Sequence, residues 1–89
     1  MQTDLKDKTE QKEKETDISV LVLYNDDVNS FEHVIACLVG ICGHSSHQAE
    51  QCAMIIHYKG KCGVKSGTMD ELIPIAEALD RAGLHLQIV

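Results

Sequence analysis

A seven-residue apolar segment that ends abruptly in three polar residues constrains this chain more than any other feature. The segment, residues 18–24 (ISVLVLY), is rich in β-branched and other apolar side chains, which favours a strand buried on much of both faces. Asn25, Asp26 and Asp27 follow at once and break the strand. An amide and two carboxylates therefore lie at the mouth of an apolar core, where they could hold a cation such as an ammonium group.

Two helices are predicted after this polar corner. Residues 31–39 carry apolar side chains spaced three and four positions apart, the stripe of an amphipathic helix. Asn29-Ser30 offers this helix an N-cap, and Gly40 and Gly43 end it. A similar stripe from Ala49 to Ile56, after a serine N-cap within 44–46, predicts a second helix that runs to about Tyr58 and is stopped by Gly60.

A third helix and two more strands complete the pattern. Thr68 and Glu71 have the spacing of a capping box and begin the helix, which ends at Gly83. Short segments at 61–65 and 85–89 predict strands; the glycine inside the first weakens that strand or marks a close approach. We expect the inner side of the third helix to carry Leu72, Ile73, Ala76, Leu79 and Ala82.

The predicted order of elements, β-α-α-β-α-β, is typical of an α/β protein of the α+β two-layer sandwich type. We expect a three-stranded, mostly antiparallel sheet with the three helices on one of its faces. Residues 18–89 suffice for one small domain of this kind.

Residues 1–17 have a composition that does not favour folding. They hold ten charged side chains, and only Met1 and Leu5 are apolar, too little to offset the entropy cost of ordering. We predict a disordered, charged tail. The tail lacks the apolar segment of a signal peptide, and no run in the chain approaches the ~18 apolar residues of a membrane span. We therefore expect a cytoplasmic protein with no membrane partner.

The charge of the folded part bears on its partners. Residues 18–89 carry eight acidic and four basic side chains, a net charge of −4. Nucleic acids select basic surfaces, so no nucleic-acid partner is expected. The charge suits a partner that brings a positive group.

Two rival constellations involve the cysteines, which we expect to be reduced. Cys42, His44, His47 and Cys52 could supply zinc ligands, but the chain has no C-x-x-C pair and Cys52 falls on an apolar stripe. A cysteine nucleophile paired with His57 would need an electropositive, accessible setting, and its neighbours here are acidic or apolar. The sequence therefore predicts no metal, no other cofactor and no catalytic site.

The chemistry of the polar corner suggests a different role. An ammonium group has three N–H donors and no acceptor. Asn25, a corner carboxylate and a neutral His57 imidazole could supply three acceptors if His57 lies against the corner. Ala53 and Ile56, one turn earlier, would border an apolar hollow beside them. The combination suits a free peptide N-terminus followed by a hydrophobic side chain. Taken singly, the corner is ordinary turn chemistry and His57 is a favourable residue for a helix C-terminus.

From about Val20 to its end the chain resembles the ClpS adaptor proteins of bacteria. The most specific matches are LYNDD at 23–27, the FExV helix start at 31–34 and MIIHYKGKCGV at 54–64. The family pattern has Asn-Asp-Asp, then a helix with Glu and Val, then His-x-x-Gly followed by Cys-Gly-Val. The resemblance implies a monomeric adaptor, not an enzyme. ClpS proteins recognise a bulky hydrophobic N-terminal residue (Leu, Phe, Tyr or Trp) and deliver the substrate to an AAA+ unfoldase, ClpA or a ClpC-type relative, which feeds the ClpP peptidase.

Carried over residue by residue, the resemblance implies two parts of a binding site and one docking region. The site for the substrate α-amino group comprises Asn25, Asp26, Asp27 and His57. The hydrophobic pocket comprises Asn29, Phe31, Val34, Ala53, Ile56 and Leu86. The region that docks the unfoldase includes Asp70 and Glu71, and the charged tail would enter that unfoldase.

Three departures from the family pattern leave finer points open. The family commonly has Met where this chain has Phe31 and Ala53; one wall of the pocket is bulkier and the other is smaller. The preference among Leu, Phe, Tyr and Trp is therefore not predicted. Ile73 replaces a basic residue often found near the docking region, which leaves the identity of the unfoldase open.

Overall fold

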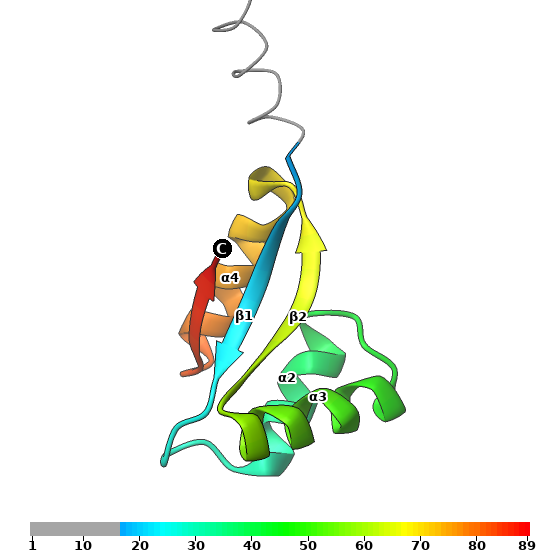
Figure 1. Cartoon of the computed structure of the whole chain (residues 1–89), viewed down its shortest axis with the longest axis vertical. Helices are drawn as coiled ribbons and strands as arrows, with labels where there is room; N and C mark the ends of the chain where they lie inside the picture. The colour runs from blue at the N-terminus through cyan, green and yellow to red at the C-terminus, as the bar shows by residue number, and fades with distance from the viewer. Residues whose placement is uncertain (1–16) are drawn as a thin grey trace, which may run out of the picture.

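The computed structural model describes residues 17–89, which form a small α+β fold (Figure 1). The predicted tail lies outside the described residues, apart from Asp17. The predicted order of elements is confirmed. It comprises β1 (Ser19–Tyr24), α2 (Phe31–Gly40), α3 (Ser46–Lys59), β2 (Lys61–Gly67), α4 (Met69–Arg81) and β3 (His85–Ile88).

The sheet has β1 as its central strand and is antiparallel throughout. Its order is β2-β1-β3, so the first strand of the chain pairs with both later strands. Leu23 lies opposite Cys62 on one side and Leu86 on the other. Because β1 is central, the chain that leaves its end emerges in the middle of one end of the sheet.

One hydrophobic core joins the sheet to all three helices. Leu21 and Leu23 of β1 are buried in the same cluster as Leu38 of α2, Ile56 of α3 and Leu72 of α4. Figure 1 shows α4 running behind the sheet, with α2 and α3 grouped beside the lower end of β2. This two-layer arrangement is the one expected from the apolar stripes.

The inner side of α4 differs from the prediction at one position. Leu72 and Leu79 are fully buried, and Ile75 and Ala76 pack against the core, but Ile73 is 41% exposed. Positions 72, 75, 76 and 79 follow the i, i+3, i+4, i+7 spacing of one helix face. Ile73 is one residue out of that spacing and turns toward solvent.

Local capping chemistry fixes where the helices begin. Ser30 accepts a hydrogen bond from the His33 amide at 3.1 Å and caps α2. The predicted capping box of α4 is confirmed, because the Thr68 amide donates to Glu71 Oε1 at 2.8 Å and the Glu71 amide donates to Thr68 Oγ1 at 3.3 Å.

Glycine allows a close approach within the sheet. A Cβ at Gly63 would lie 2.9 Å from Cγ1 of Val20, so the internal glycine of β2 marks the tight contact expected there. The β1–β2 register shifts next to it, between Leu21 and Val22. No helix within residues 17–89 is long and apolar enough to cross a membrane.

Candidate functional site

The end of β1 and the end of α3 meet at one corner of the molecule. The Asn25 amide donates a 2.9 Å hydrogen bond to the carbonyl of Gly60. Gly60 ends α3 with a left-handed conformation, φ +93°, which glycine adopts without steric cost. This bond brings the polar residues after β1 next to the last turn of α3, which carries His57.

Two adjoining hollows lie at this corner. The outer hollow measures about 460 Å³ and the inner one about 50 Å³. Asn25, Asn29, Phe31 and His57 line both, so the two hollows are direct neighbours. The outer hollow is completed by Asp26, Asp27, Met54 and Tyr58, and the inner one by Val34, Ala53 and Ile56.

The inner hollow has an apolar floor. Ala53 and Ile56 of α3 are 2% and 4% exposed, so they belong to the core and present only a small surface to the hollow. Val34 of α2 packs against the same core. Phe31, the first residue of α2, is 37% exposed and lies at the edge. The floor of the inner hollow is therefore made of side chains of the core.

The outer hollow has a polar rim that is rich in acceptors. Asn25, Asp27 and His57 are exposed. The ring of His57 meets that of Tyr58 edge to face, with centroids 4.9 Å apart. An amide, a carboxylate and an imidazole are thus displayed around an opening that leads to an apolar floor.

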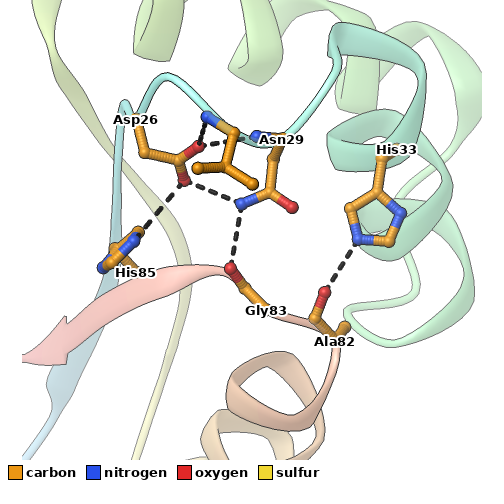
Figure 2. Close-up of polar contacts among 7 residues, drawn as sticks. Asp26, Asn29, His33, Ala82, Gly83 and His85 are labelled. Atoms are coloured by element: carbon orange, nitrogen blue, oxygen red, sulfur yellow. Dashed lines mark hydrogen bonds and ion pairs between the residues drawn. The ribbon is translucent and has the colours of Figure 1, made fainter.

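Asp26 is used differently from its neighbour Asp27. Its Oδ1 accepts from the amides of Val28 at 2.8 Å and Asn29 at 2.7 Å, and its Oδ2 accepts from Asn29 Nδ2 at 2.8 Å (Figure 2). His85 Nε2 lies 4.0 Å from Oδ2. The hydrogen bonds from Asn29 are the main reason that the pKa of Asp26 lies below its ordinary value. Both oxygens thus accept hydrogen bonds within the loop itself, and the expected role of Asp26 toward a substrate amine stays a prediction.

The same loop is fastened to the turn between α4 and β3. Asn29 Nδ2 also donates to the Gly83 carbonyl at 2.9 Å, and His33 Nε2 donates to the Ala82 carbonyl at 2.9 Å. Figure 2 shows these two ties side by side, reaching consecutive residues of the turn. The corner therefore rests on two distant segments, the end of α3 and the end of α4.

Sequence reasoning missed two residues of the outer hollow and included one residue that lies elsewhere. Met54 and Tyr58 line it beside His57. Residues 54, 57 and 58 have the i, i+3, i+4 spacing of one helix face, and this pattern could have identified them. Leu86 lines neither hollow. It packs against the core from β3, opposite Leu23, because its side chain points to the helix-covered face.

The predicted docking residues lie at the start of α4. Asp70 and Glu71 are both exposed. Glu71 is engaged in the capping box with Thr68, and those hydrogen bonds lower its pKa. Asp70 takes no part in that box.

The rival cysteine constellations are not assembled. Within residues 17–89 no group of three or more His, Cys, Asp or Glu side chains is placed to hold a metal ion. Burial raises the pKa of Cys42 to about 11, and burial with the neighbouring Cys52 raises that of Cys62 to about 11. These shifts are opposite to those that activate a nucleophilic thiol.

A third hollow lies away from this corner, beside the α2–α3 connection and β2. It measures about 380 Å³ and shares no lining residue with the other two. Lys65 lines it and donates to the Cys42 carbonyl at 3.4 Å. His44, also in the lining, is buried and donates from Nε2 to the Val64 carbonyl at 2.6 Å. The other ring nitrogen of His44, Nδ1, is buried and has no hydrogen-bond partner among the described residues.

Comparison with known proteins decides the family. The family model "ATP-dependent Clp protease adaptor protein ClpS" matches residues 14–87. The chain belongs to the ClpS family. It is accordingly an adaptor of the Clp protease and not an enzyme.

Several ClpS relatives are similar to this chain. The ClpS adapter of Thermosynechococcus vestitus is 37% identical over 67 residues, covering 74% of this chain and 71% of the relative. That of Streptomyces coelicolor is 31% identical over 65 residues, covering 73% and 68%.

A solved ClpS structure has the same fold. ClpS2 of Agrobacterium tumefaciens, determined with bound L-phenylalaninamide, superposes with a TM-score of 0.69 at 20% identity, over 81% of this chain and 94% of that chain. The likeness confirms the α+β fold of three helices and a three-stranded sheet that residues 17–89 adopt.

Proposed function

We propose that this ClpS adaptor binds the free α-amino group and the first side chain of proteins that begin with Leu, Phe, Tyr or Trp. It then delivers them to a Clp AAA+ unfoldase of the ClpA or ClpC type for degradation by ClpP. The observation that carries the proposal is that the acceptor-rich outer hollow adjoins the inner one, which has an apolar floor. A chain terminus with a hydrophobic first residue is the ligand that needs both.

The α-ammonium is bound at the rim by three kinds of acceptor. Asn25 offers its side-chain carbonyl, Asp27 a carboxylate and His57 a neutral imidazole nitrogen, which together match three N–H donors. The bond to the carboxylate is charge-assisted and therefore roughly twice as strong as a neutral one. Asp26 adds negative charge nearby while its oxygens hold the loop.

The first side chain enters the inner hollow between Phe31, Val34, Ala53 and Ile56. Burying a Leu or Phe side chain contributes about 1.5–3 kcal/mol. An internal hydrophobic residue brings no ammonium, and a terminal Glu or Lys would place a charge against an apolar floor. The ligand of the A. tumefaciens relative, which joins an aromatic side chain to a free α-amine, supports the same division of the site.

A peptide panel tests the substrate class. Fluorescent peptides that differ only in residue one (Leu, Phe, Tyr, Trp, Ala, Glu, Lys) are titrated by anisotropy, each with a free and an Nα-acetylated terminus. We expect binding of the four bulky residues and loss of binding on acetylation, which removes the charge and two donors. Equal binding of acetylated peptides, or of Glu-starting peptides, contradicts the proposal.

Delivery is the second step of the proposal, and Asp70 at the start of α4 is its test. We propose that Asp70 and Glu71 dock the unfoldase, and that the adaptor acts in the cytoplasm as a monomer. Asp70→Lys should slow degradation of a Phe-starting substrate by ClpP with ClpA or ClpC and leave peptide binding unchanged. Asp80→Lys, at the other end of the helix, is the matched control. Equal degradation rates for the two variants contradict docking at Asp70.

A further inference from the structure

We infer that Asn29 is the positioning residue of the amine site, fastening the loop that carries Asn25 and Asp27 to the turn between α4 and β3. The inference rests on the proposed function, because it names what holds two of the proposed acceptors in place. Asn29 also lines both hollows, so the tether adds to the pocket-edge position expected from the sequence.

The side chain of Asn29 has both of its amide hydrogens in use. One is donated to Asp26 Oδ2 at 2.8 Å and the other to the Gly83 carbonyl at 2.9 Å. A primary amide nitrogen has two hydrogens and no more. Both partners are pure acceptors, so the nitrogen must face them and the orientation of the amide is fixed. Asn29 is therefore a bridge between the loop and the turn (Figure 2).

The loop end of this bridge is closed by Asp26. Its carboxylate gathers the amides of Val28 and Asn29 as well as the Asn29 side chain. Asp27 lies between Asp26 and Val28 in the chain, so these hydrogen bonds close a turn around its backbone. Asp27 and Asn25 flank Asp26 directly, so the conformation that Asp26 imposes sets the direction of both neighbouring side chains.

The turn end of the bridge is a firm anchor. Gly83 has φ +90° and ends α4, with its own amide donating to the Asp80 carbonyl at 2.9 Å. The next amide, of Leu84, donates to the carbonyl of Leu79 at 3.1 Å. Leu79 and Leu84 are buried in the core. The Gly83 carbonyl is therefore fixed by the core and does not move with the loop.

His33 provides a matched comparison within the same structure. It reaches the neighbouring carbonyl of the turn, Ala82, from the first turn of α2, but it has no bond to Asp26. Removal of His33 therefore loosens α2 from the turn and leaves the Asp26–Asn29 bonds intact. Removal of Asn29 loosens the loop itself.

Substitutions at Asn29 separate the two halves of the bridge. Threonine has a single hydroxyl donor, so the Asn29→Thr side chain can donate a hydrogen bond to Asp26 or to Gly83 but not to both. The Asn29→Ala side chain can donate to neither. A loop that is less often in its binding conformation lowers the apparent affinity by the fraction that remains competent. Such a loss appears in the association rate, whereas loss of a ligand contact appears in the dissociation rate.

The experiment measures association and dissociation of a Phe-starting peptide by stopped-flow fluorescence for the wild type, Asn29→Ala, Asn29→Thr and His33→Ala. We expect Asn29→Ala to weaken binding about tenfold, mostly through slower association. Asn29→Thr should lose less, and His33→Ala should stay close to the wild type. Equal losses at Asn29 and His33, or a loss confined to dissociation, would overturn the inference.

A second readout needs no ligand and keeps the two proposals apart. Amide hydrogen exchange of Val28 and Asn29, followed by NMR, should accelerate in Asn29→Ala and Asn29→Thr but not in His33→Ala. Unchanged exchange in the Asn29 variants contradicts the positioning role even if peptides bind. If exchange responds as expected but the wild type binds no peptide of the panel, the tether stands and the proposed function fails.

Discussion

The amide of Asn25 donates to the carbonyl of Gly60 at 2.9 Å, and this bond joins the first strand to the end of α3. Asn25 begins the acidic loop, and Gly60 follows His57 by less than one helical turn. The bond therefore holds Asn25 close to His57, and both residues line the two hollows. The side-chain amide of Asn25 and the imidazole of His57 are thus brought together through the C-cap residue of α3.

The first prediction concerns His57. His57→Ala should weaken binding of a Leu- or Phe-starting peptide by about 10- to 150-fold, the range for loss of a hydrogen bond to a charged group. The side chain is exposed, so circular dichroism and thermal unfolding should be unchanged. Fluorescence anisotropy measures the affinity.

The control for His57 is a second exposed histidine of the same helix. His47 lies in the first turn of α3 and lines neither hollow. His47→Ala should bind like the wild type. Equal affinities for the two variants would remove His57 from the site.

The second prediction concerns Gly60. Gly60→Ala places a Cβ on a residue with φ +93° and should destabilise the fold by about 1–2 kcal/mol, measured by urea unfolding. Because the Gly60 carbonyl holds Asn25, the folded variant should also bind peptides more weakly. Gly40→Ala, at an open position of α2 without positive φ, should be neutral or slightly stabilising. Unaltered affinity in Gly60→Ala would show that this bond does not set the site.

The elements of the fold follow from short-range patterns. The spacing of apolar residues predicts each helix, and Ser30 and Thr68 cap α2 and α4 as their sequences indicate. Such features depend on residues three or four positions apart, which one sequence displays. Ile73 departs because it lies one position outside the face of α4 formed by residues 72, 75, 76 and 79.

The site could be predicted only in part, because its partners are far apart in sequence. The family resemblance is what assigns Asn25 and His57 to one site. The distant hydrogen-bond partner of Asn29, by contrast, is the backbone carbonyl of Gly83, 54 residues later, and every residue type has such a carbonyl. No pattern of side chains identifies it. Leu86 lies on the core face of β3. The pairing of Leu86 with Leu23 of β1 shows this position, and the sequence alone does not.

The third prediction concerns the depth of the inner hollow. Ala53 forms part of its floor and is 2% exposed. Ala53→Met should shorten the hollow and weaken binding of Phe- and Trp-starting peptides more than that of Leu-starting peptides. The ratio of the Phe and Leu dissociation constants measures this selectivity. Overpacking of the core should also cost about 1–3 kcal/mol of stability.

The ratio of the Phe and Leu dissociation constants does not change when the fraction of folded protein falls equally for both peptides. Ala36→Met is the control variant for this ratio. Ala36 is exposed on α2 and lines neither hollow. Its variant should keep the wild-type ratio. If Ala53→Met also keeps that ratio, the first side chain does not reach the floor.

The last prediction concerns acid stability and Asp26. Hydrogen bonds from Asn29 and Val28 hold the pKa of Asp26 below its ordinary value of 3.8, so near that pH the unfolded chain binds more protons than the folded one. The stability contributed by Asp26 is therefore fully present above pH 3.8 and is lost as the pH falls through the lower, folded pKa. Asp26→Asn lacks this contribution and also sets an amide donor against that of Asn29. The difference in unfolding free energy between wild type and Asp26→Asn should be largest at pH 7 and shrink below pH 3.8 in urea titrations. Glu71 titrates in both proteins and cancels in the difference. A gap that stays constant from pH 7 to pH 2.5 would mean that the Asp26 charge does not hold the loop.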